Sequence, residues 1–373
     1  MRIERVETFH FAGPVERPSG PSCAYSRVRD SIIVKLTADD GTVGWGETYA
    51  IAATRTVIDQ HLAPMLLGRD PVDHRAIWHD LWGPNFGDSL AISAIDIAIA
   101  DLRGKALGLS VAQLYGGALR DRVPVYASGI PYYEGVDPEL YWVQDALALA
   151  AQGYRAIKVR IGRYDPAREL PLLARMRAEL PESVALMADA NAAYTLHTAL
   201  RVSRVLDELG FLWLEEPIRE VDYEAFDVLT AQSPTPIAGG EIVRDRSQAS
   251  LFIARRSARI VQPDVSIVGG FAELLFVAET ARLARISTVP HCNAGGITLA
   301  ATLHLCALLP DPTAVPGTEA PMLELETPRP LFHTGLIRQP ITIDPTDGMV
   351  AVPTGPGLGI EIDEDLLRHH LVG

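Results

Sequence analysis

Short apolar segments alternate with longer helical segments from about residue 122 onward, and this alternation restricts the fold more than any other feature of the chain. Apolar runs of this length are typical of buried strands, and the segments between them show helical periodicity. Strands that alternate with helices form parallel sheets with helical crossovers. About eight such units over roughly 200 residues predict a (β/α)₈ barrel. The alternative is an open doubly wound sheet, which needs a glycine-rich phosphate turn after its first strand, and the sequence has none there.

Residues 1–121 show a different pattern. The alternating segment RIERVETFHF precedes a hairpin signal at Asp40-Gly41, and both indicate a small sheet. Helical segments follow, of which SLAISAIDIAIADLRGKALG is apolar on most sides and is expected to be buried. We expect a first domain over residues 1–121 and a barrel over residues 122–345. A glycine- and proline-rich tail, residues 346–373, is expected to pack back on the first domain.

The composition argues against several classes of protein. The formal net charge is −14 and the chain has no basic tract, which argues against nucleic acid as a partner. No apolar run approaches the roughly 20 residues of a membrane span, and the first residues do not resemble a signal peptide. The three cysteines include no C-x-x-C pair, so neither a disulfide framework nor a thiolate zinc site is indicated. We therefore expect a cytoplasmic protein without nucleic-acid or membrane partners.

Nearly every predicted barrel strand has an ionisable side chain at its C-terminal end. The carboxyl ends of barrel strands meet at one face, and this face holds the active site in barrel enzymes. In chain order these positions are Lys158 and Arg160, Asp189 and Asn191, Glu215 and Glu216, Glu241, Asp264, and His291. Successive positions lie about one strand–helix unit apart, so their side chains are expected to share one mouth.

Three consecutive strands end in the acids Asp189, Glu215 and Glu241. Uncompensated carboxylates at one mouth would repel one another, and a divalent cation removes that repulsion. Oxygen-only ligands suit Mg²⁺. Each acid taken alone could instead cap the helix that follows it. Side chains alternate along a strand, so Glu215 shares the face of Trp213 and Glu216 points the other way. Glu215 is therefore the predicted ligand.

The next two strands end in Asp264 and His291. A carboxylate beside an imidazole orients the ring and stabilises its protonated form, which makes His291 a candidate general base. Lys158 and Arg160 occupy one side of their strand because they are two residues apart. They either form ion pairs with the acids of the mouth or face an anionic substrate oxygen, and both can hold together.

Segments along nearly the whole chain resemble the enolase superfamily, and specifically its mandelate racemase subgroup. In family order they are ISAIDIAIADLRGKALGLSVAQLYGG, GYRAIKVRIG, MADANAAYT, WLEEP, IAGGE, VQPD, VPH and GPGLGIEID. The resemblance implies an α+β N-terminal capping domain, completed by the C-terminal tail, over a modified (β/α)₈ TIM barrel. It also implies Mg²⁺ as the cofactor on the three strand-end acids, and a small carboxylate substrate. The Asp264–His291 pair would act on the proton α to that carboxylate.

The resemblance assigns two further roles. Asn191 matches a position expected to hydrogen-bond the substrate. An acid near the eighth strand, opposite the metal, corresponds to Glu319 or Glu324, and the context MLELE favours Glu324.

Arg160 departs from the pattern of the mandelate racemase subgroup, which has a second lysine as a base at this position. Arginine is effectively always protonated and makes a poor base. Racemisation uses a base on each side of the carbon, whereas β-elimination needs one, and His291 could fill that role. We therefore expect a lyase, a Mg²⁺-dependent dehydratase that converts a sugar acid to a 2-keto-3-deoxy acid. The alternatives are a cycloisomerase of a sugar-acid lactone, a racemase or epimerase, an inactive barrel, and a metal-dependent hydrolase.

Substrate identity is expected to depend on two loops of the first domain, ERPSGPSCAYSR and TYAIAATR. Their side chains Tyr25, Arg27, Tyr49 and Arg55 could contact substrate hydroxyls or a distal carboxylate, or could be ordinary loop surface. We also expect the chain to form a homo-oligomer.

Overall fold

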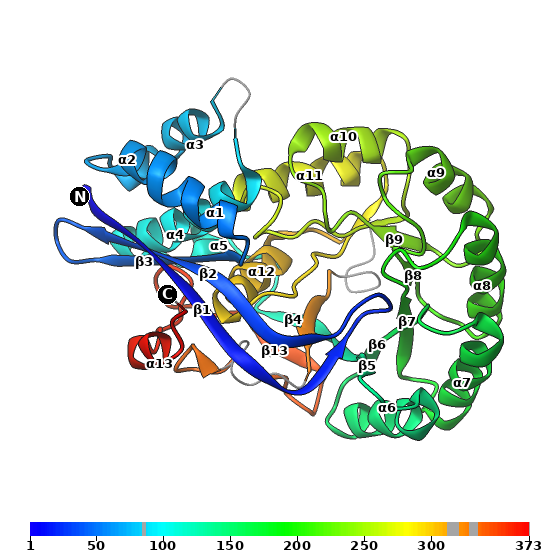
Figure 1. Cartoon of the computed structure of the whole chain (residues 1–373). Coiled ribbons are helices and arrows are strands. Elements are labelled where there is room, and N and C mark those ends of the chain that lie inside the picture. Colours follow the sequence, from blue (N-terminus) through cyan, green and yellow to red (C-terminus); the bar gives the residue numbers. More distant parts are fainter. Residues whose placement is uncertain (84–86, 312–320, 328–334, 373) are drawn as a thin grey trace.

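The computed structural model describes residues 1–83, 87–311, 321–327 and 335–372. Two sheets organise these residues, one antiparallel and one mainly parallel. Figure 1 shows the antiparallel sheet with its helices on one side of the molecule and the parallel sheet inside an arc of helices on the other. The mixed α/β class expected from the alternating pattern is confirmed.

The antiparallel sheet, named the capping sheet here, has the strand order β3-β2-β1-β5. Its strands are β1 (Ile3–Gly20), β2 (Ser26–Ala38), β3 (Val43–Tyr49) and β5 (Tyr132–Tyr133). The turn between β2 and β3 includes Gly41, whose φ of 85° suits glycine, so the predicted hairpin is confirmed. The strand β1 is longer than predicted. It includes residues 16–20, which were expected to lie in the loop ERPSGPSCAYSR.

The parallel sheet, named the barrel sheet here, curls with the strand order β11-β10-β9-β8-β7-β6-β4-β12. Its strands are β4 (Arg122–Ile130), β6 (Ala156–Arg160), β7 (Ala185–Asp189), β8 (Leu214–Glu215), β9 (Ile237–Gly239), β10 (Ile260–Val261), β11 (Ser287–Thr288) and β12 (Leu323–Glu326). An antiparallel strand, β13 (Met349–Ala351), pairs with β4. Each predicted barrel segment contains one of the parallel strands, so the predicted barrel class is confirmed.

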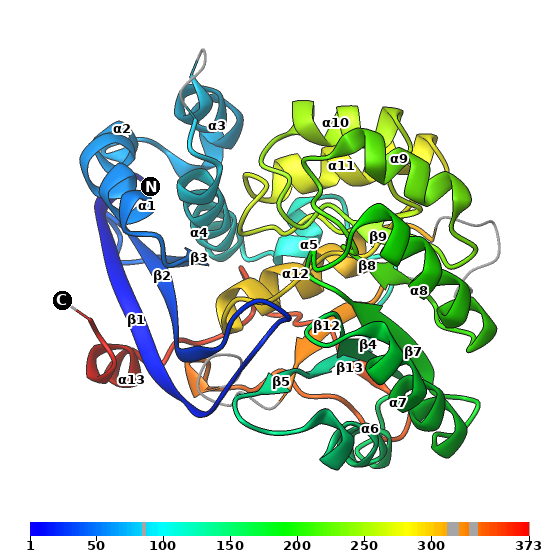
Figure 2. The same cartoon turned by 45° about the vertical axis from the view of Figure 1, so that its right-hand side comes forward.

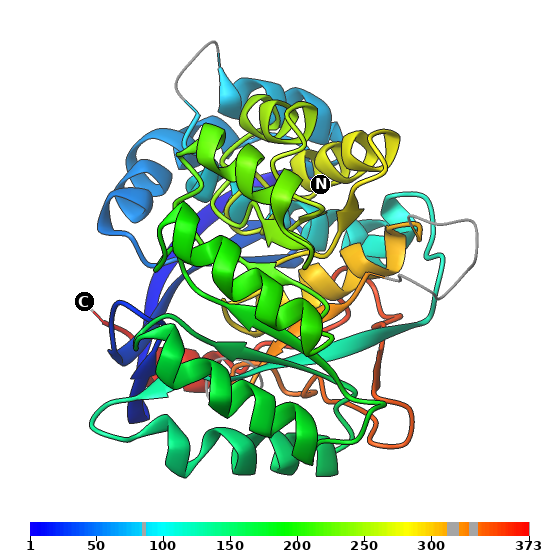
Figure 3. The same cartoon turned by 90° about the vertical axis from the view of Figure 1, so that its right-hand side faces the viewer.

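The helices between the barrel strands lie on the outside of the curled sheet (Figures 1 and 3). They are α6 (Trp142–Ala151), α7 (Pro166–Glu179), α8 (Leu196–Glu208), α9 (Tyr223–Gln232), α10 (Arg246–Ala254), α11 (Phe271–Leu283) and α12 (Gly296–Leu308). Several begin at an acidic or hydroxyl N-cap, as Asp165 does for α7 and Thr195 for α8. The helices α7, α8, α9 and α10 therefore begin where the sequence provides a capping residue.

The capping sheet carries its own helices and the C-terminal helix. They are α1 (Ala52–Val57), α2 (Ala63–Leu66), α3 (His74–Trp82), α4 (Ser89–Leu107), α5 (Val111–Leu114) and α13 (Glu364–His369). A π-helical turn over Ile58–Leu62 separates α1 from α2, although the segment TRTVIDQHLAPMLLG has continuous helical periodicity. Short 3₁₀ turns cover Pro71–Asp73 and Pro138–Leu140. None of the helices in the described ranges has the length and apolar character needed to cross a membrane.

The helix α4 packs directly on β3 because that strand presents glycines to it. A Cβ atom on Gly44 or Gly46 would lie under 3.0 Å from the carbonyl oxygens of Ala98 or Ala94. The backbones of α4 and β3 therefore approach more closely than larger residues would allow. Most residues of α4 are buried, as its apolar sequence predicts.

The two sheets exchange segments at their edges. The strand β5 follows β4 closely in the chain but pairs with β1 of the capping sheet. The tail supplies β13 to the barrel sheet, and further on Leu371 bridges Phe11 while Val372 N–H donates to the carbonyl of His10. The hairpin of β1 and β2 reaches from the capping sheet over the barrel, as Figures 1 and 2 show from two sides. Both sheets therefore contribute residues to the same mouth.

Candidate active site

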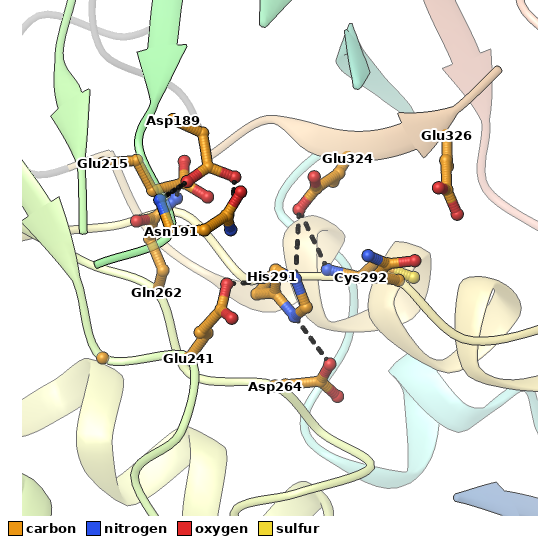
Figure 4. A network of polar contacts seen from close by, with 12 residues as sticks. Asp189, Asn191, Glu215, Glu241, Gln262, Asp264, His291, Cys292, Glu324 and Glu326 are labelled. Carbon is orange, nitrogen blue, oxygen red and sulfur yellow. Dashed lines mark hydrogen bonds and ion pairs between the residues drawn. The ribbon is translucent and has the colours of Figure 1, made fainter. Parts of the chain in front are cut away.

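Strand register brings the predicted groups together at one end of the barrel sheet. Arg160 pairs with Asp189 across β6 and β7, and Asp189 pairs with Glu215 across β7 and β8. An isolated parallel bridge joins Asp264 to His291 just beyond β10 and β11. Parallel strands in register place equivalent positions side by side. Figure 4 shows the resulting network of polar contacts.

His291 is oriented by Asp264 and faces the carboxylates with its other nitrogen. Its Nδ1 lies 2.8 Å from Asp264 Oδ2, and its Nε2 lies 3.2 Å from Glu241 Oε2 (Figure 4). Burial alone would lower the pKa of His291, but the charges of Glu241, Glu324 and Asp264 raise it to about 10. In this arrangement the carboxylates hold a proton on the imidazole.

The three predicted metal ligands each contact a cationic side chain. Asp189 Oδ2 lies 3.0 Å from Arg160 Nη1, and Glu215 Oε1 lies 2.5 Å from Lys158 Nζ. Glu241 contacts His291, as described above. As the side chains are placed, no three carboxylate, histidine or cysteine side chains of the described residues form a group that could hold a metal ion. The three acids lie at neighbouring strand ends but do not converge on one point.

The donor chemistry of this mouth nevertheless suits a hard divalent cation. Burial and the charge of Glu215 raise the pKa of Asp189 to about 6. Glu216 is buried, and its Oε1 atom has no hydrogen-bond partner among the residues that the structure describes. Burial raises the pKa of Glu216 well above the usual range. Buried carboxylates therefore outnumber the cations that compensate them, and Mg²⁺ prefers oxygen donors of this kind.

Lys158 lies beneath the mouth and is only 2% exposed. Its Nζ contacts Glu215 Oε1, Glu324 Oε1 at 2.9 Å and Asp189 Oδ2 at 4.0 Å. Burial opposes its charge, but these carboxylates raise the pKa of Lys158 above its usual range. The sequence left two roles open for Lys158, an ion pair with the acids of the mouth and contact with a substrate oxygen. The structure shows the ion pair. Lys158 in turn keeps the pKa of Glu324 well below its usual range, although burial acts in the opposite sense.

Arg160 forms the link between Asp189 and Asn191. Its Nη1 donates to Asn191 Oδ1 at 2.7 Å as well as to Asp189. The Asn191 backbone is left-handed, with φ of 45°, and its own N–H donates to Asp189 Oδ1 at 2.9 Å. Asparagine tolerates this conformation better than most residues. The amide of Asn191 is thus fixed over the end of β7.

Two further side chains in the mouth were not predicted as site residues. Arg29 extends from β2, and its Nη2 donates to Glu326 Oε1 at 2.7 Å and to Asn293 Oδ1 at 2.5 Å. Gln262 follows β10, and its Nε2 donates to Glu215 Oε2 at 2.8 Å. The only sequence signal for Arg29 is that it alternates with Arg27, two residues beyond the end of the predicted loop ERPSGPSCAYSR.

Two models of protein families match the sequence. The model described as "Enolase C-terminal domain-like" matches residues 142–366, and the model for the "Mandelate racemase / muconate lactonizing enzyme, N-terminal domain" matches residues 5–116. The chain belongs to the mandelate racemase/muconate lactonizing enzyme family of the enolase superfamily. The resemblance stated from the sequence motifs is therefore confirmed.

Relatives of this chain within the family include isomerases and lyases. The D-galactarolactone cycloisomerase of Agrobacterium fabrum is 33% identical over 98% of this chain and 98% of its own. The arabinonate dehydratase of Saccharolobus solfataricus is 29% identical over 91% of this chain and 90% of its own. The crystal structure of the 3,6-anhydro-D-galactonate cycloisomerase from Zobellia galactanivorans is 29% identical, covers 100% of both chains and has a TM-score of 0.88. The relatives named here are thus two cycloisomerases and a dehydratase.

A family structure with a metal ion bears on the carboxylate cluster. A racemase from Streptomyces coelicolor, solved with bound magnesium, is 28% identical over 99% of this chain and 100% of its own, with a TM-score of 0.86. Enolase superfamily members of this kind bind Mg²⁺, in keeping with the oxygen donors described above.

The predicted loop residues of this family member have varied surroundings. The ring of Tyr25 lies 3.9 Å from the guanidinium of Arg163, whereas Arg27 is largely exposed and pairs with Glu134. Arg55 contacts Thr8 on β1. Glu319, the alternative to Glu324, lies outside the described residues. Glu324 itself accepts a bond from the N–H of Cys292 at 3.2 Å, so it borders the residue after His291.

Proposed function

We propose that this chain is a Mg²⁺-dependent dehydratase that converts a sugar acid to a 2-keto-3-deoxy acid. The observation that carries the proposal is the asymmetry of the mouth. On one side, Arg160 is a guanidinium that stays protonated, and Lys158 forms an ion pair with Glu324, which is not a proposed metal ligand, so neither serves as a base. On the other side, His291 Nε2 faces into the network while Asp264 fixes Nδ1. One base supports β-elimination, whereas racemisation uses two.

Asp189, Glu215 and Glu241 would hold the metal ion. When bound, Mg²⁺ supplies positive charge to the developing enediolate of the substrate carboxylate. Among the charges that raise the pKa of His291, that of Glu241 has the largest effect. If Glu241 held the metal ion, the pKa of His291 would fall toward the range of a general base. The guanidinium of Arg160, from the end of β6, meets the amide of Asn191 just beyond the end of β7, where the two would bind and orient the substrate carboxylate.

The reaction then needs two proton movements at one imidazole. His291 Nε2 takes the proton from the α-carbon, and the electrons of that C–H bond form a double bond to the β-carbon. The bond from the β-carbon to its hydroxyl oxygen breaks, and the proton on His291 passes to that oxygen. Water leaves, and the remaining enol tautomerises to the 2-keto-3-deoxy acid. Asp264 stays hydrogen-bonded to Nδ1 throughout and stabilises the transient imidazolium.

A second candidate is the cycloisomerisation of a sugar-acid lactone or anhydro acid. It is favoured by the D-galactarolactone cycloisomerase of Agrobacterium fabrum, which matches 98% of this chain. The same α-proton is removed, but a ring oxygen leaves instead of a hydroxyl group, so no water is lost. The described site serves both reactions, because the leaving group differs while the base does not.

We expect turnover when the chain and Mg²⁺ are incubated with a panel of aldonic and aldaric acids, their lactones and anhydro acids. Mass spectrometry separates the two reactions, since a dehydration product is lighter than its substrate by one water and a cycloisomerisation product is not. His291→Asn should abolish turnover and the exchange of the α-proton in D₂O, because the base is lost. His61→Asn, which changes an exposed histidine of the π-helical turn, serves as the control.

Chelation of the metal should stop the reaction, and added Mg²⁺ should restore it. Full turnover in the presence of a chelator would contradict the metal dependence. Exchange that survives in His291→Asn would assign the base to another group. No turnover with any acid, lactone or anhydro acid, with Mg²⁺ present, would refute the proposed function.

A further inference from the structure

The C-terminal end of β3 docks on the two loops that carry the proposed dyad. Three consecutive residues of this strand, Glu47, Thr48 and Tyr49, bond to the barrel. Tyr49 donates its hydroxyl to Asp264 Oδ2 at 3.2 Å, and Thr48 Oγ1 donates to the carbonyl oxygen of Ser266 at 2.7 Å. The capping sheet therefore contacts the residue that orients His291, at the point where β10 ends.

Each oxygen of Asp264 has two hydrogen-bond donors. Oδ1 accepts from the N–H of Ser266 at 2.7 Å and from its hydroxyl at 2.6 Å. Oδ2 accepts from Tyr49 and from His291 Nδ1. Asp264 has no exposed surface, so its four donors determine how the carboxylate is oriented. Three of those bonds come from the barrel itself, and the fourth comes from the capping sheet.

Tyr49 is suited to remain a donor. Burial raises the pKa of its phenol well above the ordinary value, and the charges of Asp264 and Glu241 act in the same direction. The hydroxyl therefore keeps its proton beside the carboxylate and cannot compete with Asp264 as a second anion. Tyr49 and His291 Nδ1 bond the same oxygen of Asp264. The bond from Tyr49 therefore limits rotation of the carboxylate away from the imidazole ring.

Glu47, on the same strand as Tyr49, holds the loop that carries His291. Its carboxylate accepts from the backbone N–H of Gly295 at 3.0 Å and of Thr298 at 3.0 Å, which caps the beginning of α12. Gly295 lies four positions after His291, so the cap shortens the free part of the loop that carries the base. A Cβ at position 295 would lie under 3.0 Å from Glu47 Oε1, so any larger residue there would force this carboxylate to shift.

We propose that Tyr49 is a positioning residue for His291, which acts through the shared oxygen of Asp264 and thereby makes the alignment of the base depend on the docked capping sheet. The inference rests on the proposed function, because it takes His291 as the base. This role differs from the expectation that Tyr49 contacts substrate hydroxyls. Replacing a tyrosine that binds substrate changes KM, whereas replacing a tyrosine that positions the base changes kcat.

The test compares Tyr49→Phe with Thr48→Val. Both remove one hydroxyl of the docked strand with little change in shape, but only Tyr49→Phe removes a bond to the dyad. We expect Tyr49→Phe to lower kcat and the rate of α-proton exchange by about three- to tenfold, the worth of one hydrogen bond, with KM unchanged. Thr48→Val should lower the melting temperature without this loss in kcat.

A double-mutant cycle shows whether Tyr49 acts through Asp264. In an Asp264→Asn background, the additional loss from Tyr49→Phe should disappear, because the carboxylate that Tyr49 orients is gone. The ring Nδ1–H signal of His291 in protein labelled with ¹⁵N-histidine, assigned with His291→Asn, needs no substrate. It should shift in Tyr49→Phe and stay in place in Thr48→Val.

The outcomes are separable from those of the proposed function. Absence of turnover by the parent chain refutes the proposed function but leaves the Nδ1–H measurement valid. Full kcat together with an unchanged Nδ1–H signal in Tyr49→Phe would overturn the inference. So would a rise in KM alone, or equal losses in both backgrounds. If Tyr49→Phe does not fold, a perturbed Nδ1–H signal in folded Thr48→Val would likewise overturn it, because the effect would then come from docking alone.

Discussion

Arg160 is the residue that most strongly separates this chain from a two-base racemase. Its guanidinium joins Asp189 to Asn191 at the end of β7. Burial opposes its charge, but the carboxylates of Asp189, Glu326 and Glu324 raise the pKa of Arg160 further. Glu324 and Glu326 are not proposed metal ligands, so their charges would also favour the protonated form of an amine at this position. The local field, as well as the identity of residue 160, therefore disfavours a second base.

We predict that Arg160→Lys lowers kcat/KM without creating racemase activity. The side chain of lysine is one bond shorter than that of arginine, so its ammonium would not reach both Asp189 and Asn191 as Arg160 Nη1 does. The loss of one such bond costs about 1 kcal/mol, or roughly fivefold. The lysine would stay protonated beside the same carboxylates. Chiral analysis of recovered substrate measures the stereochemical outcome, and an epimer that forms in Arg160→Lys but not in the parent would contradict this prediction.

The sequence predicted the strand-end residues well and the cross-sheet residues poorly. Asp189, Glu215, Asp264 and His291 follow from one rule, since parallel strands end at one face. Tyr49 and Arg29 come from the capping sheet, and their partners lie far away in the sequence. Local periodicity holds no information on which strand of one sheet docks on which loop of another. Contacts of this kind become visible only in three dimensions.

At the scale of elements, the junction between β3 and α12 depends on one small residue. The N-cap of α12 is Gly295, and the side chain that satisfies its helix end comes from Glu47 rather than from the helix itself. Helix N-termini leave several N–H groups without intrahelical partners, and buried ones must be satisfied by another group. A strand of the capping sheet thus completes a helix of the barrel.

We predict that Gly295→Ala destabilises the fold by about 1–3 kcal/mol, the usual cost of a group forced into a packed site. The added methyl group would meet the buried carboxylate of Glu47, which has two backbone donors to lose. Chemical denaturation measures the change. Glu47→Ala removes the obstacle, so Gly295→Ala should cost little in that background. Equal costs in both backgrounds would show that the carboxylate is not the cause.

The same scale shows which elements were predictable. The barrel helices carry clear periodicity and caps, as in α7 and α8, and the structure has them where expected. The strands β8, β10 and β11 have two residues each, yet the apolar runs around them mark their positions. The π-helical turn at Ile58–Leu62 was not expected, because its sequence keeps helical periodicity and the wider hydrogen bonds leave no compositional signal.

At the scale of the whole molecule, the tail is tied to the barrel through His304. This histidine of α12 has no exposed surface, and its Nε2 donates to the carbonyl oxygen of Leu358 at 3.1 Å. Burial lowers the pKa of His304 from 6.5 to about 4. The folded protein therefore holds His304 neutral in a range of pH where the unfolded chain binds a proton there.

The sign of the resulting pH dependence follows from the lowered pKa. Between about pH 6.5 and pH 4 the unfolded state binds more protons at this site, so stability falls as the pH is lowered through this window. We predict that His304→Gln, which keeps a donor for Leu358, loses less stability on acidification. Relative to the parent, the gain should approach about 2 kcal/mol near pH 5. Parallel slopes for parent and variant in urea unfolding would contradict the prediction.

The pairing of residues 371–372 with β1 has a consequence for biosynthesis. A ribosome delivers β1 among the first segments of this chain, but the backbone partner of Phe11 follows only after the whole barrel has been made. Until then, the carbonyl of His10 and the N–H of Ala12 lack the hydrogen bonds that they form with the tail in the folded protein. The nascent chain therefore exposes an incomplete sheet edge throughout translation, and such edges recruit other strands. Chaperone demand during synthesis should accordingly track the completion of this edge more than the formation of the barrel.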